Sequence, residues 1–115
     1  MGRKVLIIDD ERDLCLIMGN HLKKKNNEVF FAPTLSEGLK VLEAWRPDVL
    51  LLDNNLPDAL GWREVNNIHA AHPSMKITLI SALDASPFAI TTDGAGYTKL
   101  EKPVSLKALD AILEN

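Results

Sequence analysis

The feature that most constrains the fold is a regular alternation of short apolar runs with longer segments of helical periodicity. Each run is at most five residues long, and the clearest runs consist almost entirely of Val, Leu, Ile and Phe, which is typical of strands buried on both faces. The runs lie at residues 5–8, 29–31, 49–52 and 77–80, with a weaker one at 97–101. Because parallel strands need a crossover, usually a helix, this order predicts a parallel sheet with helices on both faces.

The segments between the runs carry apolar residues at helical spacing. The first, residues 11–25, ends in three lysines, which suit a helix C-terminus. The second opens with Thr34 and Glu37, the T-x-x-E pattern of a capping box. A third helix is expected between the third and fourth strands, and a last one at residues 106–113. Residues 83–96 contain a proline and glycines that disfavour a long helix, so we expect a short or irregular fourth helix there.

Five strands joined by right-handed crossovers leave few topologies. The natural one is a flavodoxin-like, doubly wound α/β fold with the strand order 2-1-3-4-5. The 115 residues amount to one domain, so we expect a single domain over residues 1–115. In such a sheet, ligands bind beyond the carboxyl ends of the strands, at the switch point between the first and third strands.

Composition and charge argue against several classes of function. The net charge is −3, whereas nucleic-acid-binding domains carry a basic footprint, so we expect no direct contact with nucleic acid. No apolar run is long enough for a signal sequence or a membrane span, so we expect no membrane contact. Cys15 is the one cysteine, so no internal disulfide can form, and a cytoplasmic, reducing location fits.

Polar side chains stand at the carboxyl ends of four predicted strands. Asp9 and Asp10 follow the first strand, and Asp53 ends the third. Ser81 ends the fourth strand, and Lys102 follows the fifth. Since the first and third strands are neighbours in the predicted order, three carboxylates converge at the switch point. Like charges this close call for a cation, and carboxylate oxygens suit Mg²⁺ or Mn²⁺.

The chemistry that this set of groups favours is phosphoryl transfer. A carboxylate can be the nucleophile and become an aspartyl phosphate. A metal ion and a lysine are the usual electrostatic partners of a phosphoryl group. The alternative is that the aspartates are helix caps or turn residues, a common role for a single Asp that follows one strand.

Four segments then resemble the receiver domain of bacterial two-component response regulators, and the resemblance covers essentially the whole chain. They read VLIIDDE at residues 5–11, DVLLLDNNLP at 48–57, ISA at 80–82 and EKP at 101–103. The resemblance implies a signalling domain that accepts a phosphoryl group and is not an enzyme, beyond promoting its own phosphorylation and dephosphorylation.

The resemblance implies roles for the acidic residues. Asp53 would take a phosphoryl group from the phosphohistidine of a sensor histidine kinase or a phosphotransfer protein, and the changed surface would act on an unknown output domain or protein. Asp10 and Asp53 would hold Mg²⁺ directly, together with the backbone carbonyl of Asn55. Asp9 would act partly through water.

The resemblance also implies two phosphoryl contacts, and it is incomplete beside one of them. Ser81 would bond a phosphoryl oxygen and report its presence, and Lys102 would contact the phosphate. An aromatic residue usually stands three positions before this lysine, where the chain has Lys99. An ammonium does not enter an apolar gap unpaired, so we expect Lys99 to point to solvent and the signal to pass through residues 85–94 instead.

A second departure lies before the third predicted helix. Receivers usually carry Asp, Ser or Asn just before the glycine that opens this helix, and this chain has Leu60. A side-chain cap is lost there, and we expect Asp58 to substitute for it.

Other tempting residues have simpler interpretations. His69 and His72 lie three apart on a predicted helix, but no third ligand is near in sequence, so a solvated helix edge is expected. His21 is expected to be a packed or boundary residue, and Cys15 an inert buried thiol.

Two other functions stay open at this point. A small phosphatase with an aspartyl nucleophile would need a general acid, and Asn55 stands two residues after Asp53, where such an acid would be sought. An interaction module that is never phosphorylated would not need Asp10, Asp53, Ser81 and Lys102 together. We expect either a stand-alone regulator or a receiver that is part of a larger regulator or hybrid kinase.

Overall fold

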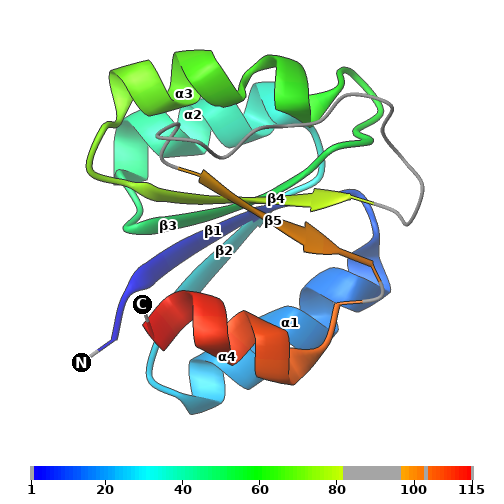
Figure 1. Ribbon diagram of the computed structural model, residues 1–115, viewed down its shortest axis with the longest axis vertical. Helices are drawn as coiled ribbons and strands as arrows, with labels where there is room; N and C mark the ends of the chain where they lie inside the picture. Colours follow the sequence, from blue (N-terminus) through cyan, green and yellow to red (C-terminus); the bar gives the residue numbers. More distant parts are fainter. Residues whose placement is uncertain (1, 82–96, 103, 115) are drawn as a thin grey trace.

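The computed structural model describes residues 2–81, 97–102 and 104–114, and it contains one parallel five-stranded sheet (Figure 1). The strand order is β2-β1-β3-β4-β5, which confirms the predicted order. The strands are β1 (Lys4–Ile8), β2 (Glu28–Ala32), β3 (Val49–Asp53), β4 (Lys76–Ser81) and β5 (Tyr97–Glu101). The weakest predicted strand, at residues 97–101, is therefore real and lies at one edge of the sheet.

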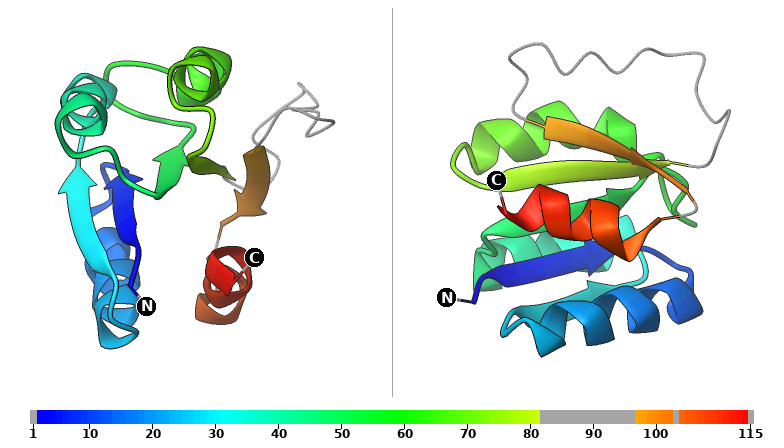
Figure 2. Two further views of the ribbon diagram at one scale, coloured as in Figure 1. Left: turned by 90° about the vertical axis from the view of Figure 1, so that its left-hand side faces the viewer. Right: turned by 60° about the horizontal axis from the view of Figure 1, so that its bottom comes forward.

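Helices cover both faces of the sheet, in two layers that Figure 2 shows on opposite sides of the strands. One layer holds α1 (Arg12–Lys24) and α4 (Leu106–Glu114), and the other holds α2 (Leu35–Trp45) and α3 (Val65–Ala71), the latter after a 3₁₀ turn, η1 (Gly61–Arg63). The predicted irregular helix at residues 83–96 lies outside the described residues. Among the described residues, no helix has the length and apolar character that a membrane span requires.

The central strands supply the core of both layers, because successive side chains of a strand point to opposite faces. On β1, Leu6 and Ile8 pack with α2 and α3, whereas Val5 and Ile7 pack with α1 and α4. All residues of β3 are buried. This two-sided burial explains why the strands read as uninterrupted apolar runs. It also holds the carboxyl ends of β1 and β3 side by side.

The loop after β3 is tied to the start of α2 by Asp58. The two carboxylate oxygens of Asp58 accept hydrogen bonds from the backbone N–H groups of Leu35 and Ser36, both at 2.9 Å. Thr34 accepts a third from Glu37 at 3.1 Å, as the capping pattern predicts. The expectation that Asp58 would cap the third helix is wrong. Its carboxylate lies closer to the free N–H groups of α2, which attract an anion.

The helix after β3 consequently begins without a side-chain cap. Neither Leu60, which precedes η1, nor Glu64, which precedes α3, accepts a hydrogen bond through its side chain at the helix start. The 3₁₀ turn instead uses backbone bonds, such as the one from the Arg63 N–H to the Leu60 carbonyl at 3.1 Å. A tight 3₁₀ turn is one of the ordinary ways to satisfy helix-terminal groups.

Candidate functional site

Three aspartates meet at the carboxyl ends of β1 and β3, and we call Asp9, Asp10 and Asp53 the acid cluster. One carboxylate oxygen from each lies within 4.8 Å of the others. The pairing of Ile8 with Leu52 places the residues that follow them beside each other. Asp9 and Asp53 are buried, and Asp10 is exposed. The structure therefore brings together the three carboxylates that the strand order predicted to converge.

Asp9, one of the two buried carboxylates of the acid cluster, has few hydrogen-bond donors. Asp9 Oδ1 accepts from the Glu11 N–H at 2.9 Å, but Asp9 Oδ2 is buried with no hydrogen-bond partner among the described residues. Burial is the main cause that raises the pKa of Asp9 above its ordinary value. Burial, followed by the charge of Asp9, raises the pKa of Asp53 to about 6. Both shifts are in the direction expected for ionised carboxylates that are buried beside each other, and the nearby Lys102 offsets only part of that cost.

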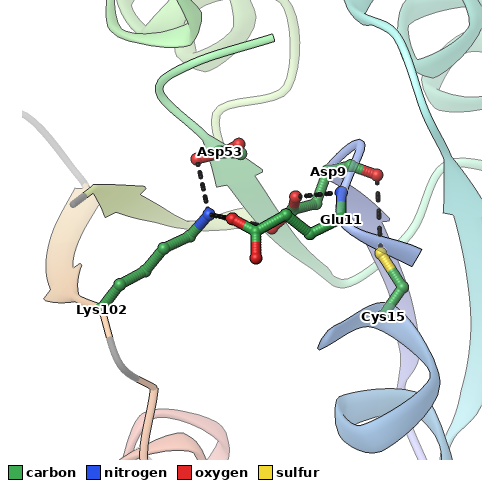
Figure 3. Close-up of polar contacts among 5 residues, drawn as sticks. All are labelled: Asp9, Glu11, Cys15, Asp53 and Lys102. Carbon is green, nitrogen blue, oxygen red and sulfur yellow. Dashed lines mark hydrogen bonds and ion pairs between the residues drawn. The ribbon is translucent and has the colours of Figure 1, made fainter. Parts of the chain in front are cut away.

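Lys102 is the cation that approaches the acid cluster from the end of β5 (Figure 3). Its Nζ lies 3.5 Å from Asp53 Oδ1, 3.7 Å from Asp9 Oδ2 and 2.5 Å from Glu11 Oε1. The Lys102 N–H donates to the Ser81 carbonyl at 2.8 Å, which fixes the lysine backbone against the end of β4. Burial alone would lower the pKa of Lys102, but the hydrogen bond to Glu11 and the charges of Asp53 and Asp9 outweigh it and raise the pKa.

Ser81 ends β4 with a buried hydroxyl that has no hydrogen-bond partner among the described residues. It lies one residue beyond Ile80, which pairs with Asp53 in the neighbouring strand. A buried hydroxyl without a partner is costly, so the site holds a hydrogen-bonding group that nothing in the described structure uses.

The loop after Asp53 is folded tightly on itself. The Gly61 N–H donates to the Asn54 carbonyl at 2.8 Å, and Asn55 pairs with Leu60 in an isolated antiparallel bridge. A Cβ on Gly61 would lie 2.4 Å from the Asp53 carbonyl oxygen, so the backbone here has room for glycine alone. This packing restrains the backbone of Asn55 next to Asp53.

A hard divalent cation fits this donor set. The acid cluster offers three carboxylates with one ligand atom each in reach, and Asp9 Oδ2 has no hydrogen-bond partner among the described residues. Carboxylate oxygens in this arrangement are the ligands that Mg²⁺ and Mn²⁺ prefer. The raised pKa values of Asp9 and Asp53 point the same way, because a bound cation would stabilise their ionised forms.

A cavity of about 400 Å³ opens beside the acid cluster, between α1 and the loop after β2. Asp9 and Asp10 form part of its wall, and Leu16, Phe31 and Pro33 form much of the rest. The cavity therefore reaches Asp9 and Asp10, although Asp53 is not part of its wall.

Sequence reasoning missed two contacts of the site. Glu11 is the third acid of the DDE run, and its carboxylate is the nearest partner of Lys102, but the run alone does not show which acid the lysine reaches. The Cys15 thiol donates to the Asp9 backbone carbonyl at 3.5 Å. Burial, with the charges of Asp9 and Asp53, raises the pKa of Cys15 to about 12, which agrees with the expected inert thiol.

The remaining candidates lie away from the acid cluster. Lys99 is exposed on β5, as expected for an ammonium in the usual aromatic position. His21 is partly buried and lies 2.8 Å from Asp110 of α4, which fits the expected boundary position. The expected solvated helix edge is wrong for the other two histidines: the His72 side chain is 9% exposed and lies 3.9 Å from Glu43, and His69 Nδ1 is buried. Neither His69 nor His72 belongs to a group of metal-ligating side chains among the described residues. Residues 85–94, expected to carry the signal, lie outside the described residues.

Comparison with known proteins decides the family. The family model of the response regulator receiver domain matches residues 5–114. The chain belongs to this family of receiver domains. As a receiver domain it is a phosphoacceptor signalling module of a two-component system, in a family that generally is not enzymatic.

Curated relatives and solved structures agree with this assignment. The chain is 32% identical over 104 residues to the transcriptional regulatory protein YxdJ of Bacillus subtilis (strain 168), covering 89% of this chain and 44% of YxdJ. It is 27% identical over 106 residues to GlrR of Escherichia coli (strain K12), covering 91% of this chain and 24% of GlrR. The receiver thus spans less than half of these curated relatives.

Among solved structures, the fold matches a CheY-like receiver domain protein from Methanospirillum hungatei JF-1 with a TM-score of 0.89 and 25% identity, over 99% of this chain and 92% of that one. A receiver domain protein from Clostridium thermocellum gives a TM-score of 0.88 and 26% identity, over 100% of this chain and 93% of that one.

Proposed function

We propose that this receiver accepts a phosphoryl group on Asp53 from the phosphohistidine of a sensor histidine kinase or a phosphotransfer protein, in a reaction that depends on Mg²⁺ or Mn²⁺. The observation that carries the proposal is the pairing of two buried carboxylates, Asp9 and Asp53, with one lysine that reaches both. This arrangement does not stabilise the fold, because buried charges are costly unless fully paired, so it indicates a functional site.

Asp53 is suited to be the nucleophile. Its pKa of about 6 leaves the carboxylate mainly ionised at neutral pH, and burial strips it of water. One Asp53 oxygen attacks phosphorus as the bond from phosphorus to the donor imidazole nitrogen breaks, and that nitrogen keeps the electron pair. The product is an aspartyl phosphate and a free imidazole.

The other residues of the site orient and neutralise the phosphoryl group. Lys102, whose Nζ is 3.5 Å from Asp53 Oδ1, contacts a phosphoryl oxygen with its fixed positive charge. The unpartnered Ser81 hydroxyl donates to another. Asp10, Asp53 and the Asn55 carbonyl, with Asp9 partly through water, would hold a metal ion whose positive charge would help to neutralise the phosphoryl group.

The output and location follow from the same proposal. Two of the relatives are named as transcriptional regulatory proteins, and the receiver spans less than half of each. We propose that the phosphorylated surface acts on a further domain or a separate protein, and that the receiver forms one domain over residues 1–115 and works in the cytoplasm.

Intact-mass spectrometry after incubation with acetyl phosphate and Mg²⁺ tests the proposal. We expect one added phosphoryl group on the wild-type chain and none on Asp53→Asn or in the presence of EDTA. Hydrolysis of an added phosphoester with many turnovers would support the aspartyl phosphatase instead. A wild-type chain that takes no phosphoryl group would favour the interaction module that is not phosphorylated.

A further inference from the structure

Glu11 is the nearest described acid to Lys102, although it is not part of the acid cluster. The Lys102 Nζ lies 2.5 Å from Glu11 Oε1, which is a full ångström closer than Asp53 Oδ1 at 3.5 Å. The Glu11 contact is within hydrogen-bond distance, whereas the Asp53 contact is long for an N–H···O bond. Figure 3 shows the Lys102 ammonium between Asp53 and Glu11, with an interaction to each. In the unphosphorylated receiver, Glu11 is therefore the main hydrogen-bond partner of the Lys102 ammonium.

Two contacts fix Glu11 in this position. Its backbone N–H donates to Asp9 Oδ1 at 2.9 Å, and its carbonyl accepts from the Cys15 N–H at 3.0 Å, which opens α1. The Glu11 side chain is more than half exposed, and that of Lys102 is 18% exposed. Glu11 thus stands at the rim of the site, over the buried carboxylates, with its backbone bonded to the acid cluster itself.

We propose that Glu11 is a positioning residue that holds Lys102 at the rim of the site and competes with the phosphoryl group for it. This inference rests on the proposed phosphorylation of Asp53. When Asp53 is phosphorylated, added negative charge lies next to the ammonium, and Lys102 shifts from Glu11 to the phosphoryl oxygens. The Glu11 contact then disfavours the phosphorylated state, so it influences how readily Asp53 becomes phosphorylated.

The direction of the effect follows from the charges. Glu11→Gln keeps the size of the side chain and removes the charge that competes for Lys102. Binding of beryllofluoride, which stands in for the phosphoryl group on Asp53, should become about two- to fivefold tighter at saturating Mg²⁺, the range that an ion pair with one exposed partner can supply. Phosphorylation by acetyl phosphate should accelerate by a similar factor.

Asp13 offers the matched control. It is an exposed acid in the first turn of α1, two residues after Glu11, and it makes no ion pair with Lys102 among the described side chains. Asp13→Asn removes the same charge from the same end of the helix without freeing the lysine. Asp13→Asn should therefore gain less beryllofluoride affinity than Glu11→Gln, because it reduces only the general repulsion of the anion.

The test is a beryllofluoride titration of the 115-residue chain, followed by fluorine NMR, on wild type, Glu11→Gln, Asp13→Asn, Lys102→Ala and the Glu11→Gln/Lys102→Ala double variant. The proposal expects Glu11→Gln to gain affinity in the wild-type background and little in the Lys102→Ala background. Equal gains in both backgrounds, or an equal gain from Asp13→Asn, would overturn it, since the effect would then be general charge removal. A wild-type chain that binds no beryllofluoride and takes no phosphoryl group would instead overturn the proposed function, and this inference with it.

Discussion

Two carboxylate sites lie near the carboxyl ends of the strands, and the pKa shifts of their aspartates have opposite signs. In the acid cluster, Asp9 and Asp53 are buried, and burial raises the pKa of each. At the start of α2, Asp58 is exposed, and two backbone N–H groups, those of Leu35 and Ser36, lower its pKa. The residue type is the same in both places, whereas the burial of the carboxylate and the charge beside it differ.

The difference separates a binding site from a structural contact. Asp58 is already satisfied by the protein, so it stabilises the fold and has little left to offer a ligand. Asp9 and Asp53 are buried beside each other, and an added cation would relieve the cost of ionising both. The two sites should therefore respond with opposite signs when their charges are removed.

The largest expected effect comes from Lys102, the cation beside the acid cluster. Lys102→Ala should slow phosphorylation by acetyl phosphate by about a hundredfold, because the transferring group loses a fixed charge partner. Mg²⁺ affinity should stay the same or rise, since a nearby positive charge is removed. Rates followed by intact mass and Mg²⁺ titrations check both. An equal loss of Mg²⁺ affinity in Lys102→Ala and Asp10→Ala would mean that the lysine is structural.

Removal of a charge from the acid cluster should stabilise the metal-free protein. At pH 7.5 in EDTA, the free energy of unfolding of Asp53→Asn should exceed that of wild type by on the order of 2 kcal/mol. Its Tm should be roughly 5–10 °C higher. The folded-state pKa of about 6 lies above the ordinary value of 3.8, so the cost of ionising Asp53 in the fold develops as pH rises from about 4 to about 6 and is complete above pH 6. The gain should vanish below pH 4, where Asp53 is protonated in both states. Thermal scans from pH 4 to 8 measure this, and a gain that does not depend on pH would contradict it.

Added Mg²⁺ should relieve the same repulsion in wild type. At ten times its Kd, a ligand that binds the folded state alone adds about 1.4 kcal/mol of stability. Asp10→Ala should gain little, since it lacks one of the proposed metal ligands. Differential scanning calorimetry with and without Mg²⁺ provides the comparison. The metal site is refuted if wild type shows no response.

The smallest effect is expected at the start of α2, and its sign is reversed. Asp58→Ala leaves two helix N–H groups without their acceptor, so Tm should fall by a few degrees at neutral pH. The pKa of Asp58 is lowered in the folded state, so this contribution is present above the unfolded pKa and is lost as pH falls through the folded one. Added Mg²⁺ should not change the deficit. A rise in Tm, as expected for Asp53→Asn, would erase the contrast between the two sites.

Much of the fold and of the site could be predicted from local sequence patterns. The apolar runs indicated β1 to β4 because these strands are buried on both faces, and even the polar edge strand β5 fell at the expected residues. Asp9, Asp10 and Asp53 were expected to meet, because the strand order and the position of each residue at a strand end suffice to place them. Parallel topology brings those ends together without any knowledge of side-chain contacts.

The contacts that sequence reasoning missed, or placed wrongly, join residues far apart in the chain. Asp58 was expected to serve the helix that follows it, but it caps α2, whose first residues precede it by more than 20 positions. The partner of Lys102 is Glu11, 91 positions away. A capping rule considers neighbours in sequence, whereas a carboxylate bonds to whichever donors the fold brings near.

The sequence by itself determined the layers, the strand order and the residues at the carboxyl ends of the strands, because hydrophobic periodicity and crossover handedness act along the chain. The tertiary structure alone decided which carboxylate is exposed and paired with backbone N–H groups, and which are buried beside one another. That outcome depends on burial and on groups from distant segments, such as the N–H groups of α2 around Asp58 and the ammonium of Lys102 between Glu11 and Asp53. Charge and hydrogen-bond energies change steeply over an ångström or two, and no local pattern fixes distances that finely.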